Sequence, residues 1–284
     1  MTYETVRTGI AFFPNDAARP VYQQLIDTGH VAALEWTVDT QSITAADQKI
    51  LQSYAEKQSL VGHGVHYSVL SVGGEKQRRT WLERLKTCPW TAHYTQLSVH
   101  FGFSSGWIFK YGAPLPVPYS QEAVAIGHKN MATLAQALPC RIGLENLALG
   151  FCRKDAENQG AFLEELLAPF QGYLLLDLHN LYCQAKNFTI ELPALLKTYP
   201  LKHVEEMHIS GGSWSRGSHT KNIRRDTHDH AVPDEVWDIL PTALEACPNL
   251  KYIFLEQLPH TLGNKEAANA YITDYKKLVK IVKG

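Results

Sequence analysis

Short apolar runs alternate with amphipathic helical stretches eight times along this chain of 284 residues. The runs are nearly continuous in hydrophobicity, which is typical of parallel strands that are buried on both faces. Eight such units predict an α/β protein, a (β/α)8 TIM barrel that forms a single domain over residues 1–284. The predicted strands are residues 6–13, 31–38, 60–68, 94–103, 141–149, 173–182, 204–212 and 252–259.

An open, doubly wound sheet is the alternative architecture for alternating strands and helices. A dinucleotide-binding sheet of that kind carries the motif GxGxxG directly after its first strand. Here the first predicted strand is followed by "PNDAARPVYQQ", which lacks the motif, and eight units exceed the number usual in such sheets. The sequence therefore favours the closed barrel.

Charge and cysteine content exclude several classes of protein. The formal net charge is −1 without a lysine or arginine block, so no nucleic-acid partner is expected. The five cysteines form no CxxC pair and are expected to be reduced thiols in a cytoplasmic protein. The first residues lack the pattern of a signal peptide, and no apolar stretch approaches the ~18 residues of a membrane span.

Ligand-type side chains occur where the predicted strands end. In TIM barrels the C-terminal ends of the strands meet on one face, which carries the active site. The loop after the seventh strand adds further candidates in the stretch "RRDTHDHAVP". In chain order the candidates are His66, His100, Glu145, Asp177, His179, Asn180, His208, Asp226, His228 and Glu256.

Three of these candidates, Glu145, Asp177 and Glu256, are carboxylates at the ends of apolar runs. An ionised carboxylate in such a place needs a cation or a strong hydrogen-bond network. Imidazole and carboxylate together suit Fe, Zn or Mn, so the convergence of acids and histidines predicts a metal centre. The principal ligand candidates are Asp177, His208, Asp226, His228 and Glu256.

Other interpretations of the same residues stay open. A single histidine at a strand end is more often a hydrogen-bonded structural residue than a ligand. A single carboxylate can instead pair with an arginine such as Arg141 or Arg153. In the sixth predicted strand, His179 is expected to point away from the barrel interior as a structural residue. His63 and His230 are expected at the outer edge of the centre or behind its ligands.

Several segments of the chain together resemble the multinuclear non-heme iron-dependent oxidative enzymes, a family that includes the iron enzyme of methanobactin biosynthesis. The segments are "VHYSVLSVGG", "SVHFGF", "PLPVPYSQEA", "GLENLA", "LLDLHNLY", "MHISGG", "DTHDHAVPDEVW" and "LEQLP". The resemblance runs from about the third strand to the end of the chain, and "DTHDHAVPDEVW" and "LLDLHNLY" are its most specific parts. The family is similar in fold to xylose-isomerase-like barrels and to three-zinc apurinic endonucleases.

The resemblance implies two to three iron ions per chain, with O2 as the co-substrate. One iron would take His66, His100 and Glu145. A second would share Glu145 and would add Asp177, His208 and Glu256. A third would take Asn180, Asp226 and His228. Because Asn180 offers a neutral amide, the third site is expected to be partly occupied. The residues expected to carry catalysis are Glu145, Asp177 and His208.

The resemblance also implies a substrate, a ribosomally made precursor peptide that is modified at a residue such as cysteine, and a separate protein that presents it. The irregular segment 104–119, rich in Gly, Pro and aromatic residues, is a candidate lid over the barrel mouth. Arg216, Arg224 and Arg225 are candidate partners for a carboxylate of the peptide. The alternative is that these three arginines are solvated loop charges.

Three other functions compete with a peptide oxidase. A zinc phosphodiesterase similar to apurinic endonucleases would need a basic groove for DNA, and near-neutral charge speaks against it. We expect a histidine in those endonucleases where Asn180 stands here, which favours iron over zinc. A metal-dependent sugar isomerase would use Mg or Mn with mostly carboxylate ligands. A barrel that has lost catalysis would be expected to lack part of the ligand set, which here is complete.

Overall fold

Eight parallel strands pair in a closed barrel, in the order β1-β10-β7-β6-β5-β4-β3-β2. The computed structural model describes residues 3, 5–39, 43–104, 114–215 and 222–284. The barrel strands are β1 (Arg7–Ala11), β2 (Ala33–Trp36), β3 (Leu60–Gly64), β4 (Gln96–His100), β5 (Arg141–Glu145), β6 (Tyr173–Asp177), β7 (Val204–Ser210) and β10 (Tyr252–Glu256). The predicted (β/α)8 barrel is therefore confirmed, and each predicted strand range contains one barrel strand.

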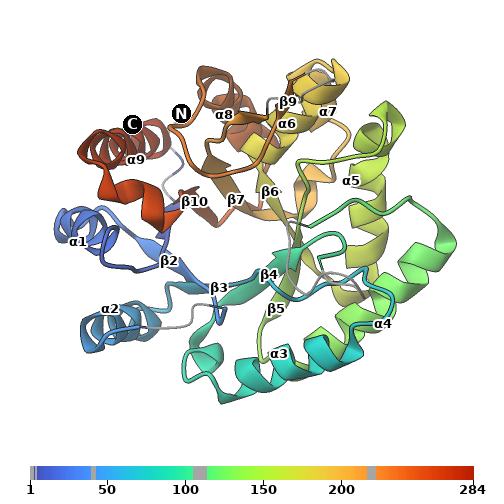
Figure 1. Cartoon of the computed structure of the whole chain (residues 1–284), viewed down its shortest axis with the longest axis horizontal. Coiled ribbons are helices and arrows are strands. Elements are labelled where there is room, and N and C mark those ends of the chain that lie inside the picture. The colour runs from blue at the N-terminus through green and yellow to red at the C-terminus, as the bar shows by residue number, and fades with distance from the viewer. Residues whose placement is uncertain (1–2, 4, 40–42, 105–113, 216–221) are drawn as a thin grey trace.

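Helices form a ring outside the barrel, as Figure 1 shows in a view through the ring of strands. They are α1 (Arg19–Asp27), α2 (Ala45–Glu56), α3 (Glu75–Thr87), α4 (Gln121–Ala137), α5 (Arg153–Leu167), α6 (Leu178–Phe188), α7 (Leu192–Leu196), α8 (Asp234–Ala246) and α9 (Lys265–Lys283). Short 3-10 helices are η1 (Thr91–His93), η2 (Ala168–Phe170), η3 (Leu201–His203) and η4 (Pro259–Gly263). A small hairpin of β8 (Trp214–Ser215) and β9 (Ile223–Arg224) follows β7.

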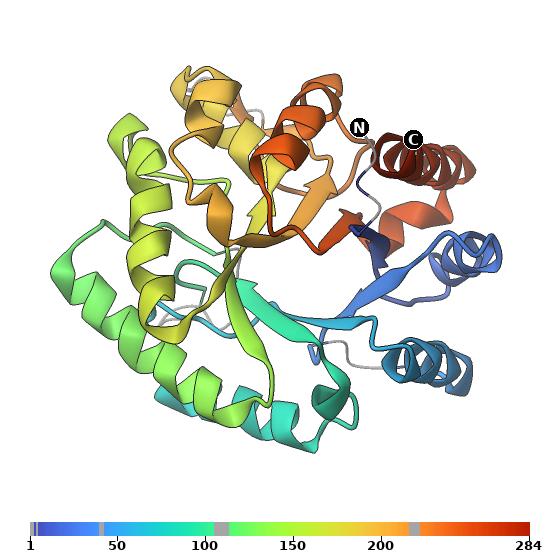
Figure 2. The same cartoon turned by 180° about the vertical axis from the view of Figure 1, so that it is seen from behind.

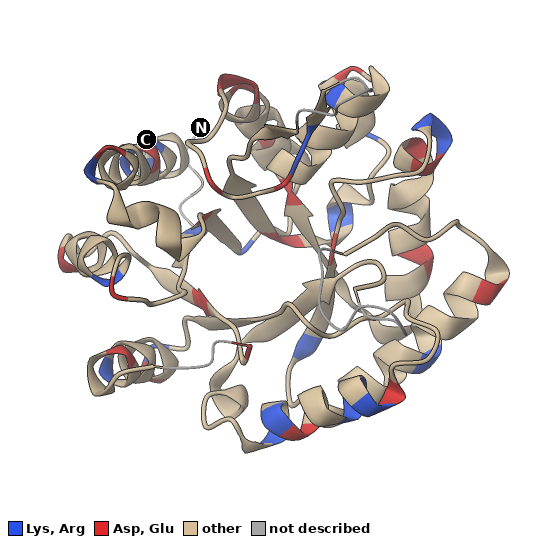
Figure 3. Ribbon diagram, in the orientation of Figure 1, with Lys and Arg blue, Asp and Glu red and all other residues tan. Residues whose placement is uncertain are grey.

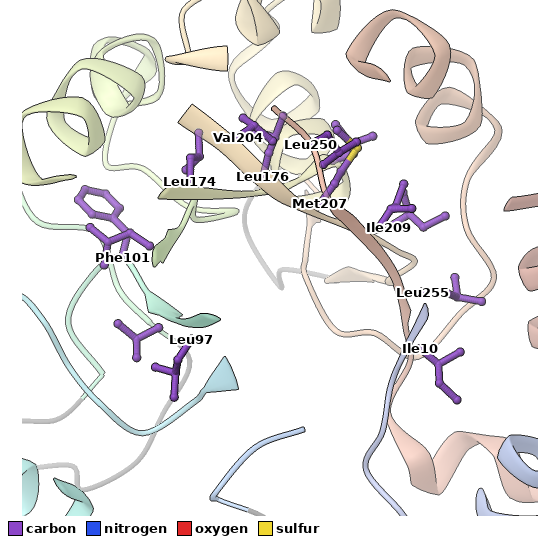
Figure 4. Packing of buried hydrophobic residues seen from close by; sticks show 14 of the residues in the cluster. Ile10, Leu97, Phe101, Leu174, Leu176, Val204, Met207, Ile209, Leu250 and Leu255 are labelled. Carbon is purple, nitrogen blue, oxygen red and sulfur yellow. The ribbon is translucent and has the colours of Figure 1, made fainter. Parts of the chain in front are cut away.

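Alternate residues of each strand have different surroundings. Leu174 and Leu176 of β6, like Met207 of β7, belong to the large apolar cluster between the barrel and its helices (Figure 4). The small apolar cluster inside the barrel is separate and comprises Ala33, Val61, Tyr252 and Phe254. Because side chains alternate along a strand, residues two positions beyond these four continue up the barrel interior.

The sixth strand is shorter than predicted, and this changes the setting of two candidate residues. It ends at Asp177, and α6 begins at Leu178, so His179 and Asn180 lie on the first turn of a helix. The Asp177 side chain caps that helix by accepting a hydrogen bond from the backbone N–H of Asn180 at 2.6 Å. An N-cap carboxylate satisfies a backbone donor that otherwise lacks a partner, which favours ending the strand here.

The two ends of the described chain lie close together. The backbone N–H of Tyr3 donates to the carbonyl oxygen of Val282 at 3.0 Å. Figures 1 and 2, which view the molecule from opposite sides, both place the N and C labels next to each other. Among the residues that the structure describes, no helix combines the length and hydrophobicity that crossing a bilayer requires.

Candidate metal centre

Acidic and imidazole side chains of several strands meet at the C-terminal end of the barrel. Figure 3 shows acidic residues on strands and loops around the centre of the barrel. Three groups of potential metal-binding atoms form there, and within each group the atoms lie within 4.8 Å of one another. The groups are His63, His100 and Glu145; Glu145, Asp177 and His208; and Asp177, His228 and Glu256.

In the first group two imidazoles face one carboxylate oxygen. The Nε2 atoms of His63 and His100 lie 3.5 Å and 3.2 Å from Oε2 of Glu145. The other ring nitrogen of His63 lies 2.8 Å from the Ser98 hydroxyl, which fixes the orientation of that ring. Two imidazole nitrogens and a carboxylate directed at one point form an arrangement that suits a transition metal.

His66, which the resemblance assigns to this group, lies in a different contact. Its Nδ1 is 3.1 Å from Oδ1 of Asp39, and its side chain is 32% exposed. The pKa of Asp39 is lowered to about 2, because its hydrogen bonds and ion pair outweigh the opposing effect of burial. His66 comes after β3 has ended at Gly64, whereas His63 lies within the strand, two residues beyond the interior Val61. The alternation of strand side chains therefore directs His63 into the barrel.

His208 and His228 link the remaining two groups through Glu256. Nδ1 of His208 lies 3.1 Å from Oε2 of Glu256, and Nδ1 of His228 lies 3.1 Å from Oε1 of the same carboxylate. Nε2 of His228 lies 2.5 Å from Oδ1 of Asp226. The structure therefore brings Asp226 and His228 of the "RRDTHDHAVP" stretch into contact with the end of β10.

The backbone of His228 has a φ of 48°, in the left-handed region. Residues other than glycine and asparagine rarely adopt this conformation, at an expense of ~1–2 kcal/mol. The carbonyl oxygen of His228 accepts a hydrogen bond from the backbone N–H of Leu258 at 2.8 Å, which holds the loop against the end of β10. Strain held in place by surrounding contacts is typical of functional sites.

Several atoms of the candidate ligands are buried without a hydrogen-bond partner among the described residues. A buried polar atom without a hydrogen bond costs ~1–3 kcal/mol, so a group of them indicates a missing partner. A metal ion would complete the coordination of such atoms. The atoms are Asp177 Oδ2 and Asn180 Oδ1, while Glu145 Oε2, His208 Nδ1 and His228 Nε2 contact only other candidate ligands, without the geometry of a regular hydrogen bond.

The pKa values of the ligand candidates indicate an excess of buried charge. Burial raises the pKa of Glu145 well above its usual range, and Asp177 and Glu256 add to this shift. Burial and the neighbouring Asp226 raise the pKa of Asp177 to about 7. The carboxylates Asp226 and Glu256 raise the pKa of His228 against the effect of burial. Bound cations would displace the protons that these raised pKa values retain and would balance the negative charge of the carboxylates, as cations do in metal centres.

Asn180 lies between the groups, close to Glu145. Its Nδ2 donates to Oε1 of Glu145 at 3.2 Å and to the carbonyl oxygen of Asn146 at 3.0 Å. These two donations fix the amide, and its Oδ1 is the oxygen that has no hydrogen-bond partner among the described residues. The Asn180 side chain thus presents a neutral oxygen to the centre.

The predicted substrate-binding arginines lie in unlike surroundings. Arg224 is buried, and its guanidinium lies over the rings of Tyr182 and Trp214 and 3.3 Å from Nε2 of His179. Arg225 is exposed and donates to the Ser213 hydroxyl at 3.3 Å. Arg216 lies outside the described residues, and so does most of the predicted lid, residues 105–113.

His179, expected to be a structural residue, and His230, expected at the outer edge of the centre or behind its ligands, lie in different surroundings. His179 is fully buried, and its Nδ1 lies 3.3 Å from Oδ1 of Asp226. It therefore lies behind Asp226, packed beside Arg224. His230 is exposed, and its Nδ1 lies 2.8 Å from Oδ1 of Asp229.

Two functional candidates were missed from the sequence, Glu35 of β2 and Glu206 of β7. Both are fully buried inside the barrel and, with His208, form a further group of potential ligand atoms. Burial, and then the neighbouring Glu35, raises the pKa of Glu206 well above its usual range. Burial opposes ionisation of Glu35 as well, but His208 and His63 lower the pKa of that carboxyl. The signal was their spacing, since Glu35 follows the interior Ala33 by two residues and Glu206 precedes His208 by two.

A model of the family described as RiPP precursor modification enzyme MbnB/TglH/ChrH matches residues 16–258 of the chain. The chain belongs to this family. RiPPs are ribosomally synthesised and post-translationally modified peptides, so members of the MbnB/TglH/ChrH family are enzymes that act on peptide precursors. The matched range contains every residue of the three groups at the barrel mouth.

Relatives of similar sequence occur in bacteria. A UPF0276 protein of Caulobacter vibrioides is 32% identical over 196 residues, which are 68% of this chain and 67% of the relative. A UPF0276 protein of Chromobacterium violaceum is 32% identical over 192 residues, 66% of each chain. The names of these two relatives state no activity.

Solved structures with the same architecture are more distant in sequence. A xylose isomerase domain protein from Planctomyces limnophilus has a TM-score of 0.58 at 13% identity, covering 97% of this chain and 95% of its own. D-psicose 3-epimerase from Clostridium cellulolyticum has a TM-score of 0.57 at 11% identity, covering 98% of this chain and 100% of its own. At such identities the similarity shows the fold, a xylose-isomerase-like barrel, and nothing about the reaction.

Proposed function

We propose that this chain is a multinuclear iron enzyme that uses O2 to oxidise a cysteine residue of a precursor peptide. The observation that carries the proposal is that the three ligand groups share members. Glu145 belongs to the first and second groups, and Asp177 to the second and third. Ions held by groups that share carboxylates lie next to each other, as a reaction between two bound partners requires.

The residues of this chain fit iron in the chemistry of their atoms. Imidazole nitrogens and carboxylate oxygens are suitable ligands for iron. The first ion would be held by His63, His100 and Glu145, with His63 in the place first assigned to His66. Glu145, shared with the first ion, would hold the second together with Asp177, His208 and Glu256. His228, with Asp226 and Asn180, would hold the third.

When bound, the irons would supply the open coordination positions and the redox chemistry with O2, while the protein supplies binding and orientation. A cysteine thiolate of the peptide is a soft ligand that iron accepts readily. The buried carboxylates Glu145 and Asp177 would hold the ions, because removal of their protons leaves strongly coordinating oxygens in a dry site. The strained loop at His228 and the contact of His228 with Glu256 would fix the outer edge of the centre.

An oxygen-dependent assay tests this proposal. The protein is purified anaerobically, loaded with Fe(II) and incubated with cysteine-containing peptides encoded near its gene, with and without O2. We expect iron-loaded protein to change the mass of a cysteine residue in the presence of O2, as detected by mass spectrometry. Zinc-loaded protein and anaerobic samples should leave the peptide unchanged. Equal modification by zinc-loaded protein without O2 would instead support a hydrolase or isomerase.

A further inference from the structure

Glu35 lies inside the barrel, below the residues of the proposed metal centre. It is fully buried, one residue before the end of β2. Its Oε2 lies 2.6 Å from Nε2 of His208, which reaches across the barrel interior from β7. A contact this short between a carboxylate and an imidazole is a charge-assisted hydrogen bond, among the strongest that side chains form.

The two ring nitrogens of His208 have different roles in this arrangement. Nε2 is directed inward, toward Glu35. Nδ1 is directed toward the barrel mouth, where it lies 3.1 Å from Oε2 of Glu256, another ligand candidate. A neutral imidazole carries one proton, and the nitrogen that donates to a carboxylate leaves the other nitrogen as the electron-pair donor. The geometry therefore assigns metal binding to Nδ1.

We infer that Glu35 is a positioning residue, which accepts the Nε2–H of His208 and thereby holds Nδ1 toward the metal ion at the barrel mouth. The inference rests on the proposed metal centre. Carboxylate–histidine–metal arrangements of this kind fix the tautomer and the ring orientation of the ligand and increase its basicity. Glu35 thus contributes to metal affinity without touching the ion.

Glu205, on the same strand as His208, provides a control outside the centre. It is buried, and its carboxylate forms ion pairs with Arg141 and Lys251. The substitutions Glu35→Gln and Glu205→Gln therefore make the same change from carboxylate to amide, and the first alone alters the hydrogen bond to His208.

The experiment titrates the metal-free proteins anaerobically with Co(II) and with Fe(II). We expect Glu35→Gln to lower the affinity for one of the bound ions by about 10–100-fold, because this is the usual effect of losing a hydrogen-bond partner of a metal ligand. The Co(II) ligand-field spectrum of that site should change as well. Glu205→Gln should bind within about threefold of the wild type, with an unchanged spectrum. Thermal unfolding of the metal-free proteins shows that both variants are folded.

The outcomes separate this inference from the proposed function. If the wild type binds the metal and Glu35→Gln matches Glu205→Gln in affinity and spectrum, Glu35 is not a positioning residue. If the wild type binds neither metal, the metal centre itself is refuted. Should Glu35→Gln not fold, Glu35→Asp is measured instead, because it keeps the charge but withdraws the carboxylate by one methylene; an affinity equal to that of the wild type would again overturn the inference.

Discussion

Asp177→Asn protein is expected to lose at least one of its metal ions and to lose peptide modification by more than ~100-fold. Asp177 belongs to two of the three ligand groups, as Glu145 does, whereas every other residue of these groups belongs to only one. Losing a partner behind a ligand already costs ~10–100-fold in affinity or activity, and losing a ligand should cost more. Metal analysis and single-turnover assays on peptide measure both effects.

The substitution was chosen because it preserves the local fold. Oδ1 of Asp177 accepts the helix-capping hydrogen bond from Asn180, and an asparagine oxygen can do the same. Oδ2 has no hydrogen-bond partner among the described residues, and the substitution replaces this atom with an amide nitrogen that cannot bind metal. Asp155→Asn, which makes the same change in the first turn of α5, is the control. Full metal content and activity in Asp177→Asn would refute its assignment as a ligand.

His63→Ala and His66→Ala are expected to differ sharply, although the two residues are three positions apart. Removing His63 deletes one of two imidazoles that face Glu145, so one ion should be lost and activity should fall by more than ~100-fold. Removing His66 deletes a part-exposed contact with Asp39. That loss should lower the free energy of unfolding by ~1 kcal/mol or less and leave the metal content unchanged.

The two variants distinguish the ligand that the geometry of the site assigns to the first ion from the ligand that the resemblance assigns to it. The resemblance alone assigns His66 to the first iron, whereas the interior position of His63 assigns that residue. Metal content after anaerobic loading, measured together with thermal unfolding, gives the answer for both variants. Loss of an ion in His66→Ala with full retention in His63→Ala would show that the original assignment was right.

The sequence predicts the barrel well because its signal is repeated. Eight apolar runs, each followed by a helical stretch, indicate the fold even though each predicted range extends beyond the strand that it contains. The error in the sixth strand has a local cause. "YLLLDLHNLY" is apolar throughout, and the hydrophobic pattern does not reveal that Asp177 caps a helix that begins one residue later. His179 and Asn180 were therefore expected on a strand.

The candidate site was predictable to the extent that its residues end strands. Glu145, Asp177 and Glu256 are each the last residue of a barrel strand. Residues deeper in the barrel need the alternation of side chains as well. Placing Glu35 and His63 in the barrel interior requires counting in steps of two from interior residues, and this needs strand boundaries that apolar runs define poorly.

The most direct test of the account is the metal content of wild-type protein purified without oxygen from cells grown with ample iron. Because the ligand groups share carboxylates and contain buried atoms without a hydrogen bond, we predict two to three irons per chain. The Mössbauer spectrum should show more than one iron environment. Stoichiometric zinc without an iron signal, or a chain that binds no metal at all, would contradict the account.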